Sequence, residues 1–135
     1  MNALNWCSEF EGFTAGQSNL KCLPDSFCNL VNLQTCSLAM NNLTELPRDF
    51  GKLQSLHTLR LDQNLLTSLP ESFGELKRLE SLDLFNNKLP AVPECLYLLT
   101  QLKVLELSKV GDLLQYSPVF HARYLRSWSW PLMIG

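Results

Sequence analysis

The chain repeats one eleven-residue pattern, as LHTLRLDQNLL at residues 56–66 and as LESLDLFNNKL at residues 79–89. Both stretches carry leucine at the first, fourth, sixth and eleventh positions and asparagine at the ninth. Around Leu59 and Leu82, leucine alternates with other residues at a period of two, which is typical of a short strand with one buried face. Arg60 and Asp83 then point away from the leucines. The sequence therefore predicts short strands that bury leucine on one side only.

The pattern recurs along the chain at a period of 23 residues. A degraded first unit occupies residues 10–32, three further units occupy 33–55, 56–78 and 79–101, and a fifth begins at 102 and loses the pattern after 109. Strands that recur in one register with long connections must pair in parallel, and adjacent units must stack to bury their leucines. We therefore expect an α/β solenoid of four to five repeats, with short parallel strands on one face and irregular or 3-10 return segments on the other.

These residues resemble the leucine-rich repeat family, whose LxxLxLxxNxL pattern appears twice in full. The LPxxF segment that follows the asparagine is similar to the intracellular 23-residue class found in Ras-pathway scaffolds and in Scribble and Erbin. The resemblance covers about residues 10–109. It divides the chain into an N-terminal extension or weak cap at 1–9, repeats at 10–109, and an aromatic-rich cap or disordered tail at 110–135. It also implies that the strands line a concave face that binds partners.

An asparagine stands at the end of each of three strands, where the chain leaves the sheet. A side-chain amide can pair with backbone N–H and C=O groups of adjacent coils that would otherwise be buried without partners. We expect these residues to form a structural ladder; they are Asn41, Asn64 and Asn87.

The outward positions beside the strand leucines form the candidate partner-binding surface. Phe85 is its largest apolar member, and an aromatic residue beside arginine and carboxylates is typical of small protein-binding patches. The alternative is that these side chains are ordinary surface residues that cover their neighbours. The candidate residues are Thr58, Arg60, Asp62, Gln63, Ser81, Asp83, Phe85, Asn86 and Glu106, within an exposed ribbon that also includes Thr35, Ser37, Ala39, Met40, Val104, Ser108 and Lys109.

Composition and motifs argue against nucleic-acid binding and catalysis. A net charge of -2 from 11 basic and 13 acidic residues, without a basic cluster, does not suit a polyanion. No nucleophile elbow, P-loop, HExxH or glycine fingerprint occurs, so we expect no enzyme, no catalytic residue, no metal and no cofactor. Five cysteines without a CxxC pair suit neither a disulfide framework nor a zinc site. Cys36 occupies the position of Leu59 and should lie in the core, while His57 stands at a variable position.

The function predicted from these features is non-enzymatic protein binding or scaffolding in signal transduction, with a partner such as a small GTPase, a phosphatase subunit or a junction protein. The start of the chain has no basic, apolar leader and no segment reaches membrane-helix length, so we expect a cytoplasmic protein, membrane association to be unlikely, and a monomer. Two alternatives stay open. The chain could be a truncated or alternatively spliced product with little binding activity. It could instead associate with membranes through tail residues Arg123, Arg126, Trp128 and Trp130.

Overall fold

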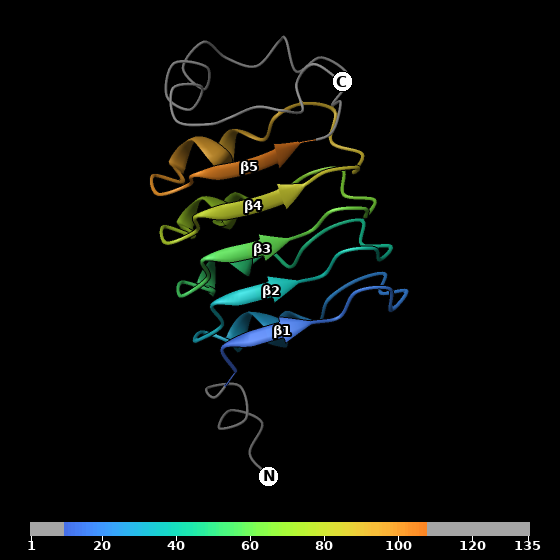
Figure 1. Ribbon diagram of the computed structural model, residues 1–135, viewed down its shortest axis with the longest axis horizontal. Helices are drawn as coiled ribbons and strands as arrows, with labels where there is room; N and C mark the ends of the chain where they lie inside the picture. The colour runs from blue at the N-terminus through green and yellow to red at the C-terminus, as the bar shows by residue number, and fades with distance from the viewer. Residues whose placement is uncertain (1–9, 108–135) are drawn as a thin grey trace.

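The computed structural model describes residues 10–107, and this part of the chain is a solenoid with a parallel sheet along one side (Figure 1). The sheet has the order β1-β2-β3-β4-β5, and every neighbouring pair is parallel. Leu59 lies opposite Cys36 on one side and Leu82 on the other, so each strand pairs with the equivalent residues one repeat away. The predicted solenoid and its 23-residue register are confirmed. The strands are β1 Gly12–Thr14, β2 Thr35–Ser37, β3 Thr58–Arg60, β4 Ser81–Leu84 and β5 Val104–Leu107.

The return segments on the other side are short 3-10 helices, in agreement with the sequence prediction, and none of residues 10–107 is in an α-helix. Pro24, Pro70 and Pro93 stand directly before three of them with φ values of -67°, -66° and -62°. Proline suits this place because its ring fixes φ near this value and the first turn of a helix needs no N–H from it. The helices are η1 Asp25–Asn29, η2 Phe50–Lys52, η3 Glu71–Glu75 and η4 Glu94–Leu98.

The core lies between the sheet and the 3-10 helices and runs through all the coils. Leucines from the strands meet a column of phenylalanines from the return side. The rings of Phe27 and Phe50 are stacked with centroids 6.4 Å apart, and those of Phe50 and Phe73 with centroids 5.9 Å apart. Cys36 is 2% exposed and occupies the place of a strand leucine, so its predicted core position is confirmed.

Adjacent coils approach closely at Gly51, which is buried in η2. A Cβ atom there would overlap the carbonyl oxygen of Ser72 and lie 2.7 Å from its carbonyl carbon. At Gly74, one repeat later, an added Cβ would instead meet Cδ1 of Leu98 at 2.7 Å, the end of a flexible and exposed side chain. The nearest atom is thus backbone at Gly51 but the end of a side chain at Gly74, where the nearest backbone atom, the carbonyl oxygen of Cys95, is 3.3 Å away.

Gly51→Ala is therefore expected to lower the free energy of unfolding by about 1 to 3 kcal/mol, because backbone cannot move aside without separating two coils. Gly74→Ala should cost clearly less, because the Leu98 side chain can change rotamer. Urea denaturation of the two variants beside the wild type measures the difference. Equal losses at the two positions would contradict the proposed role of the coil contact at Ser72.

Several sequence predictions lie outside the described residues. These are the extension or cap at 1–9, the cap or tail at 110–135, and the ribbon positions Ser108 and Lys109. The division of the chain into these three parts stays a prediction. In the part that the structure describes, no helix has the length and apolar character that crossing a membrane requires.

Candidate functional site

The asparagine column joins each coil to the one before it. Nδ2 of Asn64 donates to the carbonyl oxygens of Leu38 at 2.9 Å and Leu61 at 3.1 Å, and its Oδ1 accepts the N–H of Leu43 at 3.1 Å. Leu38 and Leu43 belong to the preceding repeat, whereas Leu61 belongs to the asparagine's own. Because these backbone groups are buried, the amide supplies partners that water cannot. Asn41 and Asn87 bond in the same way at the neighbouring coils.

We call the outward side of the sheet the strand face; it comprises Thr35, Ser37, Ala39, Met40, Thr58, Arg60, Asp62, Gln63, Ser81, Asp83, Phe85, Asn86, Val104 and Glu106. The chain turns away from it through residues in the left-handed backbone region, Gln63 at φ 58° and Asn86 at φ 59°, and both are exposed. Thr58, Ser81 and Glu106 are half-buried. All nine candidate binding positions therefore lie on one surface, although they differ in exposure.

The sequence predicts that all of the ribbon is exposed, but Asp62 is only 4% exposed, so this prediction is wrong for Asp62. The guanidinium of Arg60 lies against it, with Nε donating to Oδ1 and Nη2 to Oδ2, each at 3.2 Å. This two-point geometry is the one that arginine and carboxylate groups favour. Ala39, at the same place one repeat earlier, is also buried, since its methyl group does not reach past its neighbours. Asp62 therefore supports Arg60 and presents little surface to a partner.

Asp83 is half-buried on the strand face, and its Oδ1 accepts the N–H of Phe85 at 2.9 Å. The pKa of this carboxyl is raised to about 6, chiefly by burial and also by the nearby carboxylates of Asp62 and Glu106, while the Phe85 N–H and the Arg60 cation lower it in part. Arg60 gives only weak compensation because its donors are turned to Asp62. Asp83 is thus an oriented carboxylate that forms no ion pair with a cation of residues 10–107.

Three large apolar side chains are exposed on the same face. Phe85 and Met40 are each 40% exposed and Val104 is 49% exposed. Phe85 belongs to the binding residues predicted from sequence, whereas Met40 and Val104 were placed on the ribbon without a binding role. The repeat position alone identifies both as outward, so their apolar character was the signal that could have singled them out.

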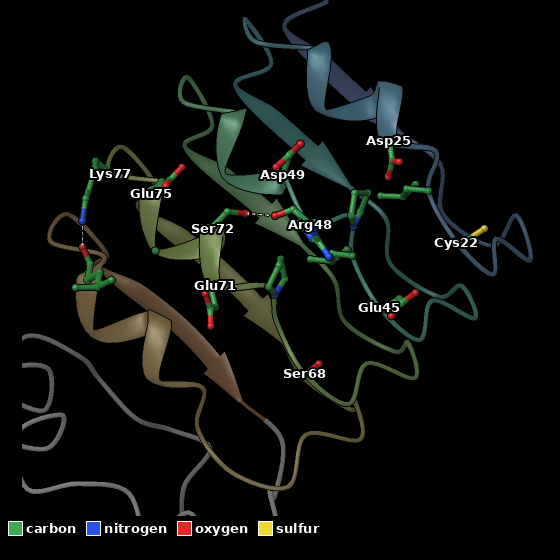
Figure 2. A pocket seen from close by; sticks show the side chains of 16 residues that line it. Cys22, Asp25, Glu45, Arg48, Asp49, Ser68, Glu71, Ser72, Glu75 and Lys77 are labelled. Atoms are coloured by element: carbon green, nitrogen blue, oxygen red, sulfur yellow. Dashed lines mark hydrogen bonds between the residues drawn. The ribbon is translucent and has the colours of Figure 1, made fainter.

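A hollow lies on the return side, between the 3-10 helices (Figure 2). Its volume is about 1160 Å³, and the sequence did not predict it. Figure 2 shows its carboxylates spread over several coils rather than gathered around one point. Ser72 Oγ donates to the carbonyl oxygen of Arg48 at 2.6 Å, and Lys77 Nζ donates to that of Leu98 at 2.9 Å. The charged lining residues are Asp25, Glu45, Arg48, Asp49, Glu71, Glu75 and Lys77.

Three of the described thiols, those of Cys28, Cys36 and Cys95, have the properties of structural groups rather than nucleophiles. Burial raises the pKa of Cys36 to about 12 and that of Cys95 to about 11, and it also raises the pKa of Cys28. A nucleophilic cysteine needs the opposite shift, toward the thiolate. Between residues 10 and 107, no group of three or more histidine, cysteine, aspartate or glutamate side chains is placed to hold a metal ion.

Comparison with known proteins places this geometry in a family. A family model described as a leucine-rich repeat region matches residues 10–122. A leucine-rich repeat protein of Leptospira interrogans is 32% identical, with a TM-score of 0.56 and coverage of 78% of this chain and 33% of that one. The leucine-rich repeat domain of the type III effector XopL is 25% identical, with a TM-score of 0.64 and coverage of 91% and 52%.

A plant peptide hormone receptor, RGFR1 in complex with RGF2, is 25% identical, with a TM-score of 0.67 and coverage of 75% of this chain and 17% of that one. The chain therefore spans about half or less of the length of these solved relatives. No curated protein sequence matches it.

Proposed function

Because this chain belongs to the leucine-rich repeat family, we propose that it is a non-enzymatic interaction module whose strand face binds a protein partner. The family and its fold generally serve protein interaction. The observation that carries the proposal for this chain is the exposure of Phe85 on the strand face, beside Arg60 and Asp83. Aromatic and arginine side chains supply most of the binding energy in protein interfaces, and the polar groups around them set orientation.

The rigidity of the surface supports this function. The asparagine hydrogen bonds and the continuous core hold the strand-face residues in one arrangement before a partner arrives. A preordered surface loses less conformational entropy on binding than a flexible one. The plant receptor relative was solved with a peptide hormone, which is a precedent for a peptide ligand on this kind of scaffold.

The finer parts of the proposal are a scaffolding or signalling role, a cytoplasmic location, and a partner such as a small GTPase, a phosphatase subunit or a junction protein. The described cysteines Cys22, Cys28, Cys36 and Cys95 are all free thiols, which fits a reducing compartment. Support for a non-catalytic role comes from the spread of the carboxylates in the return-side hollow, since acid–base catalysis requires groups that converge on one substrate atom.

Selection of a displayed random-peptide library on the intact chain tests the proposal. Selected peptides are expected to bind Phe85→Ala at least tenfold more weakly, since loss of a central aromatic anchor costs about 2 kcal/mol or more. Glu71→Gln is the matched control on the return side and should leave binding unchanged. If the selected peptides bind Phe85→Ala as tightly as the wild type but bind Glu71→Gln more weakly, the binding site is on the return side and the proposal is contradicted. Equal melting temperatures of both variants exclude unfolding as the cause.

A further inference from the structure

The negative charges on the strand face are unequally compensated. Asp83 in β4 lies directly opposite Glu106 in β5, and no ion pair joins either one to a cation among residues 10–107. Like charges at paired strand positions repel one another. The residues just before the same two strands, Glu80 and Lys103, form an ion pair of 3.5 Å. The charges of Glu80 and Lys103 therefore compensate each other, whereas Asp83 and Glu106 are two facing negative charges.

Arg60, the cation that acts on Asp83 in the described part of the chain, is already engaged. Arg60, opposite Asp83 on the β3 side, makes two hydrogen bonds to the buried carboxylate of Asp62. The charged groups that act on Asp83 are thus Arg60 and Asp62 from one neighbouring coil and Glu106 from the other. Because the charge of Arg60 is offset by Asp62, Arg60 competes only weakly with a cation from outside the chain for Asp83 and Glu106.

Apolar side chains flank the two carboxylates. Phe85 stands two residues after Asp83, and Val104 stands two residues before Glu106, and both project from the strand face with about half or less of their surface exposed. The hydrogen bond from the Phe85 N–H fixes the Asp83 carboxylate beside the aromatic residue. A cation there could interact with the face of the ring as well as with the carboxylates.

From this charge complementarity we propose that the strand face recognises an extended segment of a partner protein that carries an arginine or lysine next to an apolar side chain. Asp83 and Glu106 bind the cation, and Phe85 and Val104 contact the apolar neighbour. The inference rests on the proposed function and names the class of partner for that same surface. It assigns to Asp83 a role in specificity, because a neutral segment gains nothing from the two carboxylates.

Three synthetic peptide pools test the inference on the intact chain. One pool carries a fixed arginine–leucine pair, the second replaces arginine by citrulline, and the third replaces it by glutamate; all other positions are uncharged and contain no histidine. Citrulline keeps the shape of arginine and removes its charge. We expect the arginine pool to bind at least tenfold more tightly than the citrulline pool, and Asp83→Asn or Glu106→Gln to remove most of that preference. Glu71→Gln, which removes a carboxylate from the return side, should preserve it.

The affinity should also depend on pH. The cation binds the ionised form of Asp83, and the pKa of this group is raised to about 6, so protonation removes the binding form as the pH falls. Affinity for the arginine pool should fall about tenfold between pH 7 and pH 5, as expected for one group that must be ionised. In Asp83→Asn the same change in pH should have little effect.

Two results would overturn the inference. Equal affinities for the arginine and citrulline pools would show that the charge is not recognised, and a preference that persists in both carboxylate variants would place recognition elsewhere. If the citrulline pool binds as well as the arginine pool and Phe85→Ala abolishes both, the inference fails while the proposed function stands. If no pool and no selected peptide depends on Phe85, both fail.

Discussion

Replacement of Asn64 by alanine is expected to lower the free energy of unfolding by about 1 to 3 kcal/mol, the cost of leaving a buried backbone group without a partner. The substitution removes the acceptor of the Leu43 N–H. The carbonyl oxygens of Leu38 and Leu61 each lose one donor and keep a second one, from Asn41 and Asn87. With Asn64 only 3% exposed, water cannot replace it at those positions. Thermal or urea denaturation followed by circular dichroism measures the loss.

Asn87→Ala is the matched control for this prediction. Asn87 makes the equivalent bonds to Leu66, Leu61 and Leu84, but it is half-buried rather than buried. Water has better access to the groups that this substitution would free, so the loss should be smaller. A loss at Asn87 equal to or larger than that at Asn64 would show that burial does not set the cost of breaking the ladder.

Leu82→Ala is expected to lower the free energy of unfolding by about 2 to 5 kcal/mol, the range found when a large buried side chain leaves a cavity. Leu82 is 0% exposed in the central part of β4, and its strand neighbours Leu59 and Leu105 are also buried. The coils on either side are held by hydrogen bonds, so they cannot collapse freely into the space. Since domains of this size are stable by only about 5 to 15 kcal/mol, the substitution threatens folding.

The control for the cavity is Leu98→Ala, which removes the same side chain from the surface. Leu98 is 53% exposed at the end of η4, and its carbonyl oxygen keeps its bond from Lys77 in the variant. We expect a change within about 0.5 kcal/mol, as is usual for surface substitutions. A Leu82→Ala protein with an unchanged urea midpoint would contradict the assignment of this residue to the core.

Much of the fold could be predicted because the same 23-residue pattern recurs along the chain. The period of 23 places Cys36, Leu59 and Leu82 opposite one another, since strands in a solenoid pair with the equivalent residue of the next unit. The core position of Cys36 follows from its place in that column, even though the residue there is cysteine and not the leucine of the other units. The short 3-10 helices follow from the prolines and from the small number of residues available for the return.

The surface was less predictable. Sequence spacing places Arg60, Asp62, Asp83 and Phe85 on one exposed face. The structure has them on that face and Phe85 is exposed as expected, but Asp62 is buried. The period-two alternation of residues in a strand indicates only the side of the sheet to which a side chain points. It does not indicate whether a longer neighbouring side chain covers that residue. The hollow between the 3-10 helices escaped prediction for a similar reason, since its residues come from several coils. The LPxxF segments that supply many of them predict return segments and not the space between those segments.

The sequence by itself determined the repeat, the register of the strands, the leucine core and the positions of the three asparagines. Each of these follows from local periodicity and from the need to bury apolar surface and satisfy backbone groups. Only the tertiary structure decided that Arg60 pairs with Asp62 and that, within residues 10–107, no cation forms an ion pair with Asp83 or Glu106. That balance depends on distances and burial between coils, and electrostatic interactions follow distance and burial in space rather than position along the chain.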